Sequence, residues 1–170
     1  MLTLIIGGAG SGKSVFAEEL LCKLPGRRIY LAAMLPRDAE SYARVEKHRA
    51  RRACLHFETL ERGLDLAGAD IPHHANVLLE DLSNLLANEL YEPEGGGTGA
   101  VYRALAHWID GSEHLTVVTN EVFSGGADYD AECLRYLRAL ADLNRWLAGR
   151  AELVVEVVCG LPNVLKGELP

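Results

Sequence analysis

The chain has 170 residues, of which 49% are apolar and 24% are charged, and its formal net charge is −7. This is an ordinary composition for a globular protein with a sizeable core, and we predict a single domain over residues 1–170. The negative charge argues against general binding of nucleic acid or anionic membranes, and no apolar run reaches membrane-spanning length. The first apolar run is too short for a signal peptide, so we expect a cytoplasmic protein. The scattered cysteines are predicted to be reduced packing residues rather than a disulfide or zinc framework; they are Cys22, Cys54, Cys133 and Cys159.

Apolar runs alternate with segments of helical spacing along the whole chain. Strands are predicted at residues 2–6, 28–33, 56–59, 76–80, 115–119 and 153–158, with a short edge piece at 164–165. Helices are predicted at residues 15–24, 38–53, 61–67, 82–91, 101–109 and 130–148, and residues 94–99 read as a glycine-rich loop. The strands are apolar along most of their length, which is typical of strands buried on both faces. The fold class predicted is therefore α/β, with a mainly parallel sheet and helices on both faces.

Residues 7–14 carry the most specific motif in the chain. They read Gly7-Gly8-Ala9-Gly10-Ser11-Gly12-Lys13-Ser14. This fits G-x-x-x-x-G-K-[ST], the phosphate-binding loop, or P-loop. A predicted strand precedes it and a predicted helix follows it, which is the context that the motif requires. The fold is thus expected to be of the P-loop NTPase type.

The residue types of the loop match the chemistry of a nucleoside triphosphate. Glycines let the backbone approach a phosphate closely, and the N–H groups of the loop and of the following helix then face the anion. Lys13 is expected to reach the β- and γ-phosphates, and the Ser14 hydroxyl to hold Mg²⁺.

Further functional residues are expected just after the strands, because ligands of parallel α/β sheets bind outside the carboxyl ends of the strands. Glu80-Asp81 and Asn120-Glu121 occupy such positions. Successive strand residues point to opposite faces, so one acid of the first pair is expected to face Mg²⁺. We favour Glu80, with Asp81 as the alternative. Asp81 also precedes a predicted helix, where it could instead serve as the N-cap.

The segment 40–52 is strongly basic in an otherwise acidic chain. Glu40, Arg44, His48 and Arg52 recur every four residues, so a helix would present them as one stripe. One interpretation is a solvated basic helix face. The other is a second anion site, in which arginines grip phosphates and the histidine acts as a nucleophile.

These motifs together resemble the bifunctional adenosylcobinamide kinase/adenosylcobinamide-phosphate guanylyltransferases of cobalamin biosynthesis. The resemblance covers nearly the whole chain. It includes the phosphate loop, the spacing of Glu40, Arg44 and His48, and the segments 78–82, 118–122 and 143–148. The chain departs from the family pattern at Gly10, where an arginine is usual, at Ala53, and at residues 123–128 and 137–141.

The resemblance implies two reactions, with ATP and GTP as nucleotide substrates and a corrinoid as acceptor. The first phosphorylates adenosylcobinamide, and the second transfers GMP from GTP to the phosphate through a covalent intermediate at the histidine that matches His48. Arg44 and Arg52 would then contact the nucleotide. Family members can assemble as trimers, so the resemblance also implies a homo-oligomer. The residues leave two other interpretations open: a P-loop kinase of another small molecule, and a nucleotide-binding partner protein without transfer activity.

Overall fold

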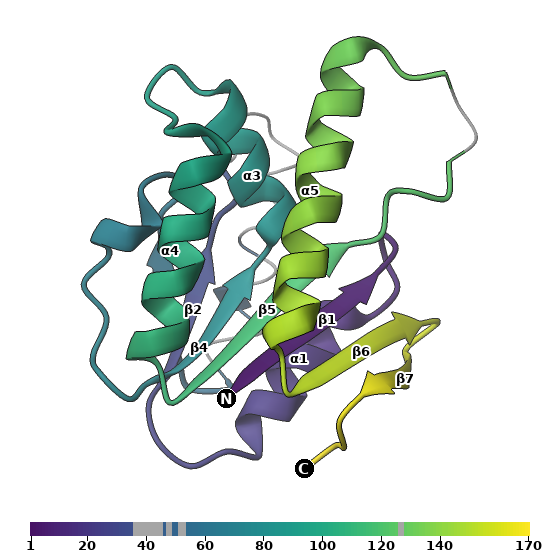
Figure 1. Cartoon of the computed structure of the whole chain (residues 1–170). Coiled ribbons are helices and arrows are strands. Elements are labelled where there is room, and N and C mark those ends of the chain that lie inside the picture. Colours follow the sequence, from purple (N-terminus) through teal and green to yellow (C-terminus); the bar gives the residue numbers. More distant parts are fainter. Residues whose placement is uncertain (36–45, 47–48, 51–53, 126–127) are drawn as a thin grey trace.

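The computed structural model describes residues 1–35, 46, 49–50, 54–125 and 128–170. The described residues form a seven-stranded sheet with four α-helices and one short 3₁₀ helix (Figure 1). The strands are β1 Leu2–Gly7, β2 Arg28–Ala32, β3 Phe57–Glu61, β4 Asn76–Glu80, β5 His114–Asn120, β6 Leu153–Val158 and β7 Leu161–Lys166. The helices are α1 Lys13–Cys22, α3 Leu82–Tyr91, α4 Gly97–Gly111 and α5 Ala131–Arg150, and the 3₁₀ helix is η1 Leu66–Gly68.

The strand order in the sheet is β3-β2-β4-β5-β1-β6-β7. The first six strands in this order are parallel, and β7 is antiparallel to β6. β1, which leads into the phosphate loop, lies between β5 and β6. All six parallel strands therefore direct their carboxyl ends to the edge of the sheet where the loop begins.

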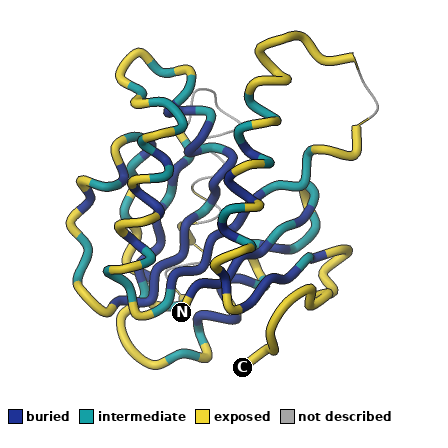
Figure 2. The backbone as a smooth tube through the Cα atoms, in the orientation of Figure 1, coloured by how far each residue is buried: buried dark blue, intermediate teal, exposed yellow. Residues whose placement is uncertain are grey.

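Each face of the sheet has its own apolar core. Side chains of α3, α4 and α5, among them Leu86, Leu105 and Leu143, pack on one face. α1 packs on the other face through Ala17, Leu20 and Leu21. Figure 1 shows α3, α4 and α5 in front of the sheet and α1 behind it, and Figure 2 shows the central strands as a buried layer and β7 as exposed. The α/β class, the mainly parallel sheet and the helices on both faces are as the sequence predicts.

Four local expectations differ from the structure. The helix predicted over residues 61–67 is wrong, because Glu61 still belongs to β3 and only Leu66–Gly68 are helical. Helix α4 begins at Gly97, inside the predicted loop. The edge piece predicted at residues 164–165 is a full strand, β7. Three of the four free cysteines are exposed, so only Cys22 packs against the core.

Candidate active site

The phosphate loop connects the end of β1 to the start of α1. Gly10 and Gly12 have φ values of 72° and 91°, a backbone conformation that side chains other than glycine rarely adopt. At Gly7, a Cβ atom would lie 2.5 Å from Ser11 Oγ and 2.6 Å from the Val157 carbonyl oxygen. The loop thus requires glycine at these three positions for steric reasons.

Helix α1 begins at Lys13, and its N-cap residue, Gly12, has no side chain that could cap the helix. Its first N–H groups lack intrahelical partners, as they do in every α-helix, so they face the loop as donors for an anion. Lys13 is buried, with its Nζ donating to the Gly8 carbonyl oxygen at 3.1 Å. A cationic group and a helix N-terminus therefore converge inside one loop, which is the arrangement that phosphates need.

Ser14 connects the loop to the acidic end of β4. Its hydroxyl donates to Glu80 Oε1 at 2.6 Å, and Glu80 Oε2 is buried without a hydrogen-bond partner in the described part of the chain. Burial raises the pKa of Glu80 to about 7, the charges of Asp81 and Glu18 add to this, and Ser14 and Lys13 oppose it. A hydroxyl beside a carboxylate offers the oxygen ligands that Mg²⁺ prefers. These two residues therefore fit a magnesium ion bound with the nucleotide.

Asp81 has a different task. It is the N-cap of α3, and its Oδ1 accepts from the Asn84 N–H at 2.7 Å and from Ser83 Oγ at 2.5 Å. Its Oδ2 accepts from the side-chain amides of Asn84 and Asn120, each at 3.2 Å. Since both oxygens are engaged, the structure places the cap role on Asp81 and leaves Glu80 as the acid beside Ser14.

The turn between β6 and β7 supports the loop from its other side. The Gly160 N–H donates to the Ser11 carbonyl oxygen at 2.8 Å, and a Cβ added to Gly12 would lie 3.2 Å from Gly160 Cα. Sequence reasoning missed this contact. The Cys159-Gly160 pair indicates a turn, but nothing in its sequence indicates that the turn lies against residues 11 and 12.

The structure describes only residues 46 and 49–50 of the basic segment 40–52. Glu40, Arg44, His48 and Arg52 lie outside the described residues. Among the described neighbours, Arg49 donates to Glu61 at 2.5 Å and to Glu46 at 2.7 Å. Glu61 ends β3, and Ala32 pairs with Glu61 on one side and Glu80 on the other. The residue that follows His48 is therefore bound at the same edge of the sheet as Glu80.

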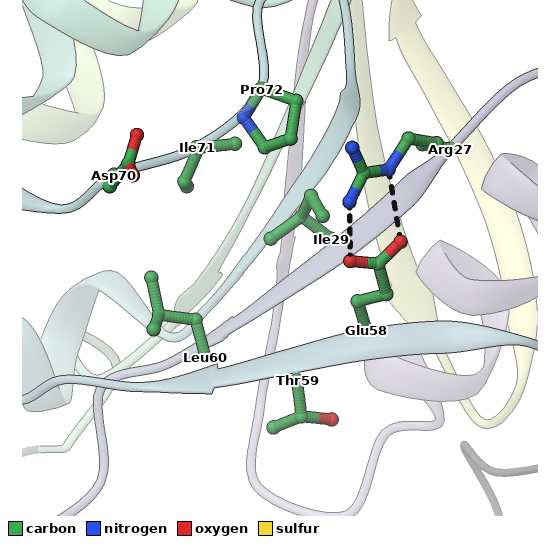
Figure 3. Close-up of a pocket in the computed structure, with 8 residues that line it drawn as sticks. All are labelled: Arg27, Ile29, Glu58, Thr59, Leu60, Asp70, Ile71 and Pro72. Atoms are coloured by element: carbon green, nitrogen blue, oxygen red, sulfur yellow. Dashed lines mark hydrogen bonds and ion pairs between the residues drawn. The ribbon is translucent and has the colours of Figure 1, made fainter.

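A cavity of about 360 Å³ lies elsewhere, toward the amino ends of β2 and β3 (Figure 3). Arg27 donates two hydrogen bonds to Glu58 at its rim, at 3.0 and 2.7 Å, and both side chains are more than half exposed. Leu60 and Ile71 contribute apolar walls. The cavity is lined by none of the residues predicted for the nucleotide, so we do not assign it to the reaction.

Comparison with known proteins shows to which family the chain belongs. The model of the cobinamide kinase / cobinamide phosphate guanyltransferase family matches residues 3–165. The chain belongs to this family. It is 35% identical over 176 residues to the bifunctional adenosylcobalamin biosynthesis protein CobP of Pseudomonas aeruginosa, covering 99% of both chains. It is 32% identical over 184 residues to the bifunctional adenosylcobalamin biosynthesis protein CobU of Salmonella typhimurium, covering 98% of this chain and 100% of the relative.

As a member of the cobinamide kinase / cobinamide phosphate guanyltransferase family, the protein is a bifunctional kinase and guanylyltransferase of cobalamin biosynthesis. Its substrates are a nucleotide and a corrinoid. The resemblance seen in the motifs is therefore confirmed. No helix in the described ranges is both long and apolar enough to cross a membrane.

Proposed function

We propose that the protein phosphorylates adenosylcobinamide with ATP or GTP and then transfers GMP from GTP to the product through a guanylyl-histidine at His48. In the kinase step, Lys13 neutralises the β- and γ-phosphates, while Ser14 and Glu80 hold Mg²⁺. In the transfer step, the His48 imidazole attacks the α-phosphorus of GTP and pyrophosphate leaves. The corrinoid phosphate then attacks the guanylyl-histidine, which gives adenosyl-GDP-cobinamide and frees the histidine.

The single observation that carries the proposal is the hydrogen bond from Ser14 to Glu80 at 2.6 Å. It joins the phosphate loop to the acid at the end of β4, so that a hydroxyl oxygen and a carboxylate oxygen lie side by side where the nucleotide phosphates would bind. The Arg49–Glu61 pair adds support, because it ties a residue of the basic segment to the same edge of the sheet.

Histidine suits the covalent step for reasons of pKa. Its unperturbed pKa of about 6.5 leaves it largely uncharged at neutral pH, so it can act as a nucleophile and later as a leaving group. Arg44 and Arg52, four residues before and after His48, carry the charge needed to neutralise the α-phosphate during attack.

Two labelled nucleotides test the proposal. Label from [α-³²P]GTP should remain on the protein in the presence of Mg²⁺ and move to adenosylcobinamide phosphate when that acceptor is added. Label from [γ-³²P]GTP or [γ-³²P]ATP should move to adenosylcobinamide and leave the protein unlabelled. Nucleotide binding without transfer of either label would refute the proposal.

We also propose that the protein forms a homo-oligomer, a trimer by family resemblance. Light scattering coupled to size exclusion tests this, and a mass of 18.5 kDa at all concentrations would contradict it.

A further inference from the structure

Asn120 lies between the two halves of the candidate active site. It is the last residue of β5, and it pairs with Gly7, the first residue of the phosphate loop. The next residue, Glu121, donates its N–H to the Gly7 carbonyl oxygen at 2.9 Å. On the opposite side, the Asn120 side chain reaches Asp81, which directly follows Glu80. Asn120 is thus adjacent to both the loop and the acidic end of β4.

The side-chain amide of Asn120 has a fixed orientation. Its Nδ2 donates to Ser83 Oγ at 2.5 Å and to Asp81 Oδ2 at 3.2 Å. A carboxylate only accepts hydrogen bonds, so the NH₂ end of the amide must face Asp81. Both hydrogens are then used, and the carbonyl oxygen Oδ1 points the other way. This oxygen has no hydrogen-bond partner within the described ranges, and the residue is partly exposed.

Asp81 and Ser83, which accept hydrogen bonds from the Asn120 amide, are fixed by further contacts of their own. Asp81 and Ser83 are 8% and 7% exposed, and the Ser83 hydroxyl donates to Asp81 Oδ1 at 2.5 Å. The Asp81 carboxylate caps α3, and the Tyr136 hydroxyl donates to the Ser83 carbonyl oxygen at 3.1 Å. Helix α3 with its N-cap residue, supported by α5, therefore fixes the amide at the end of β5. A group fixed in this way loses little conformational freedom when it binds a partner.

The Oδ1 atom of Asn120 determines which kind of chemical group this side chain can bind. A carbonyl oxygen repels phosphate and accepts from an O–H or N–H donor. At the γ-phosphate end of a phosphate loop, the O–H donors are the substrate hydroxyl that attacks phosphorus and the water molecules on Mg²⁺. In the proposed function Ser14 and Glu80 would serve the metal, so the attacking hydroxyl is the donor that falls to Asn120.

We propose that Asn120 Oδ1 accepts a hydrogen bond from the attacking hydroxyl of the corrinoid and holds it in line with the γ-phosphate in the kinase step. This inference rests on the proposed function. In that step the hydroxyl oxygen forms a bond to the γ-phosphorus, and the bond from that phosphorus to the β–γ bridging oxygen breaks. The nucleoside diphosphate leaves, and the hydroxyl proton passes to solvent, because a neutral amide does not retain it. Ser83 and Asp81 act as positioning residues.

The test compares the two half-reactions in one variant. Asn120→Ala should lower kcat for phosphorylation of adenosylcobinamide by roughly tenfold to a hundredfold, the cost of a misplaced reacting group. Labelling of the protein by [α-³²P]GTP, the Kd for GTP and the Mg²⁺ concentration for half-maximal activity should stay unchanged. Ser83→Ala, which removes one of the two anchors of the amide, should give a smaller loss of the same pattern.

Asn84→Ala is the matched control. The Asn84 side chain donates to the same carboxylate at 3.2 Å but belongs to α3, and its backbone N–H keeps the cap. Its kinase kcat should stay within about twofold of the wild type. Three results would overturn the inference: an unchanged kinase step in Asn120→Ala, an equal loss of guanylyl labelling, or a raised Mg²⁺ requirement, which would assign the amide to metal-bound water instead. Failure of the proposed function looks different, because the wild type would then transfer no label.

Discussion

The Ser14 hydroxyl donates a hydrogen bond of 2.6 Å to the Glu80 carboxylate, although 66 residues separate the two along the chain. Ser14 belongs to the first turn of α1, and Glu80 ends β4. β5 lies between β4 and β1 in the sheet. The hydrogen bond therefore reaches past β5 and joins the phosphate loop, which follows β1, to the acid at the end of β4.

Replacement of Glu80 should weaken the binding of Mg²⁺ and leave the fold intact. Glu80→Gln keeps the shape and a hydrogen-bond acceptor for Ser14 but removes the negative charge. We expect the Mg²⁺ concentration for half-maximal turnover to rise roughly tenfold or more, as for other changes around metal ligands, with an unchanged circular dichroism spectrum. If Asp81→Asn raised the Mg²⁺ requirement and Glu80→Gln did not, the choice between the two acids would be wrong.

The raised pKa of Glu80 predicts how stability depends on pH in the metal-free protein. The carboxyl titrates near 4.5 when unfolded and at about 7 when folded. Below 4.5 both states are protonated, and between 4.5 and 7 only the unfolded state ionises, so this group lowers stability as pH rises. The shift corresponds to on the order of 3 kcal/mol.

Urea unfolding in EDTA at pH 4.5 and pH 7.5 measures this effect, with Glu80→Gln as the reference that lacks the titrating group. The wild type should lose more unfolding free energy than Glu80→Gln between the two pH values. Equal losses would show that burial does not raise the Glu80 pKa.

Lys13 should contribute to the affinity for the phosphates of a nucleotide and not to the affinity for the nucleoside. Loss of one charge-assisted contact costs about 1.5–3 kcal/mol, which corresponds to roughly a tenfold to hundredfold change in Kd. We expect Lys13→Ala to weaken GTP and ATP binding by that factor in calorimetry and to leave guanosine binding unchanged. An equal loss for guanosine would argue against the phosphate-loop assignment.

Two neighbouring glycines should respond differently to a methyl group. Gly7→Ala would place Cβ 2.6 Å from the Val157 carbonyl oxygen, whereas a Cβ at Gly8 meets nothing within 4 Å. We expect Gly7→Ala to lower the free energy of unfolding by about 1–3 kcal/mol, and Gly8→Ala to change it by no more than about 0.5 kcal/mol. Thermal denaturation without nucleotide measures both, and equal melting temperatures would contradict the steric argument.

His48 should be the site of the guanylyl adduct. Intact mass spectrometry after incubation with GTP and Mg²⁺ should show one added GMP in the wild type, labile in acid and stable in alkali as expected for a phosphoramidate. His48→Ala and His48→Asn should lack the adduct and guanylyl transfer while keeping some corrinoid phosphorylation. A wild-type adduct mapped to another residue would refute the assignment.

The fold class can be predicted from the sequence because the signals that indicate it lie in short, continuous segments of the chain. The glycine pattern at residues 7–14 and the apolar runs of the strands each follow from neighbours in the chain. The segment 61–67 shows where such local signals fail. Its composition suits a helix, but Glu61 pairs with Ala32 on β2, and this tertiary contact extends β3 instead.

The candidate site is predictable only as far as motifs reach. Ser14 and Glu80 follow from the loop and from the acidic strand end. The fixed amide of Asn120 does not, because it depends on Ser83 and Asp81, more than 35 residues earlier in the chain. The hydrogen bond from Gly160 to Ser11 likewise needs the sheet order, which places β6 beside β1.

The position of β1 also sets the order in which a newly made chain can become functional. β1 is made before the other strands that the structure describes, yet its two partners, β5 and β6, begin at residues 114 and 153. The contact that supports Ser11 comes from Gly160, 149 residues later in the chain. Such distant pairings form late, since a long stretch of chain must first be ordered. A nascent chain therefore carries its phosphate motif long before β5, β6 and Gly160 exist to shape the nucleotide loop.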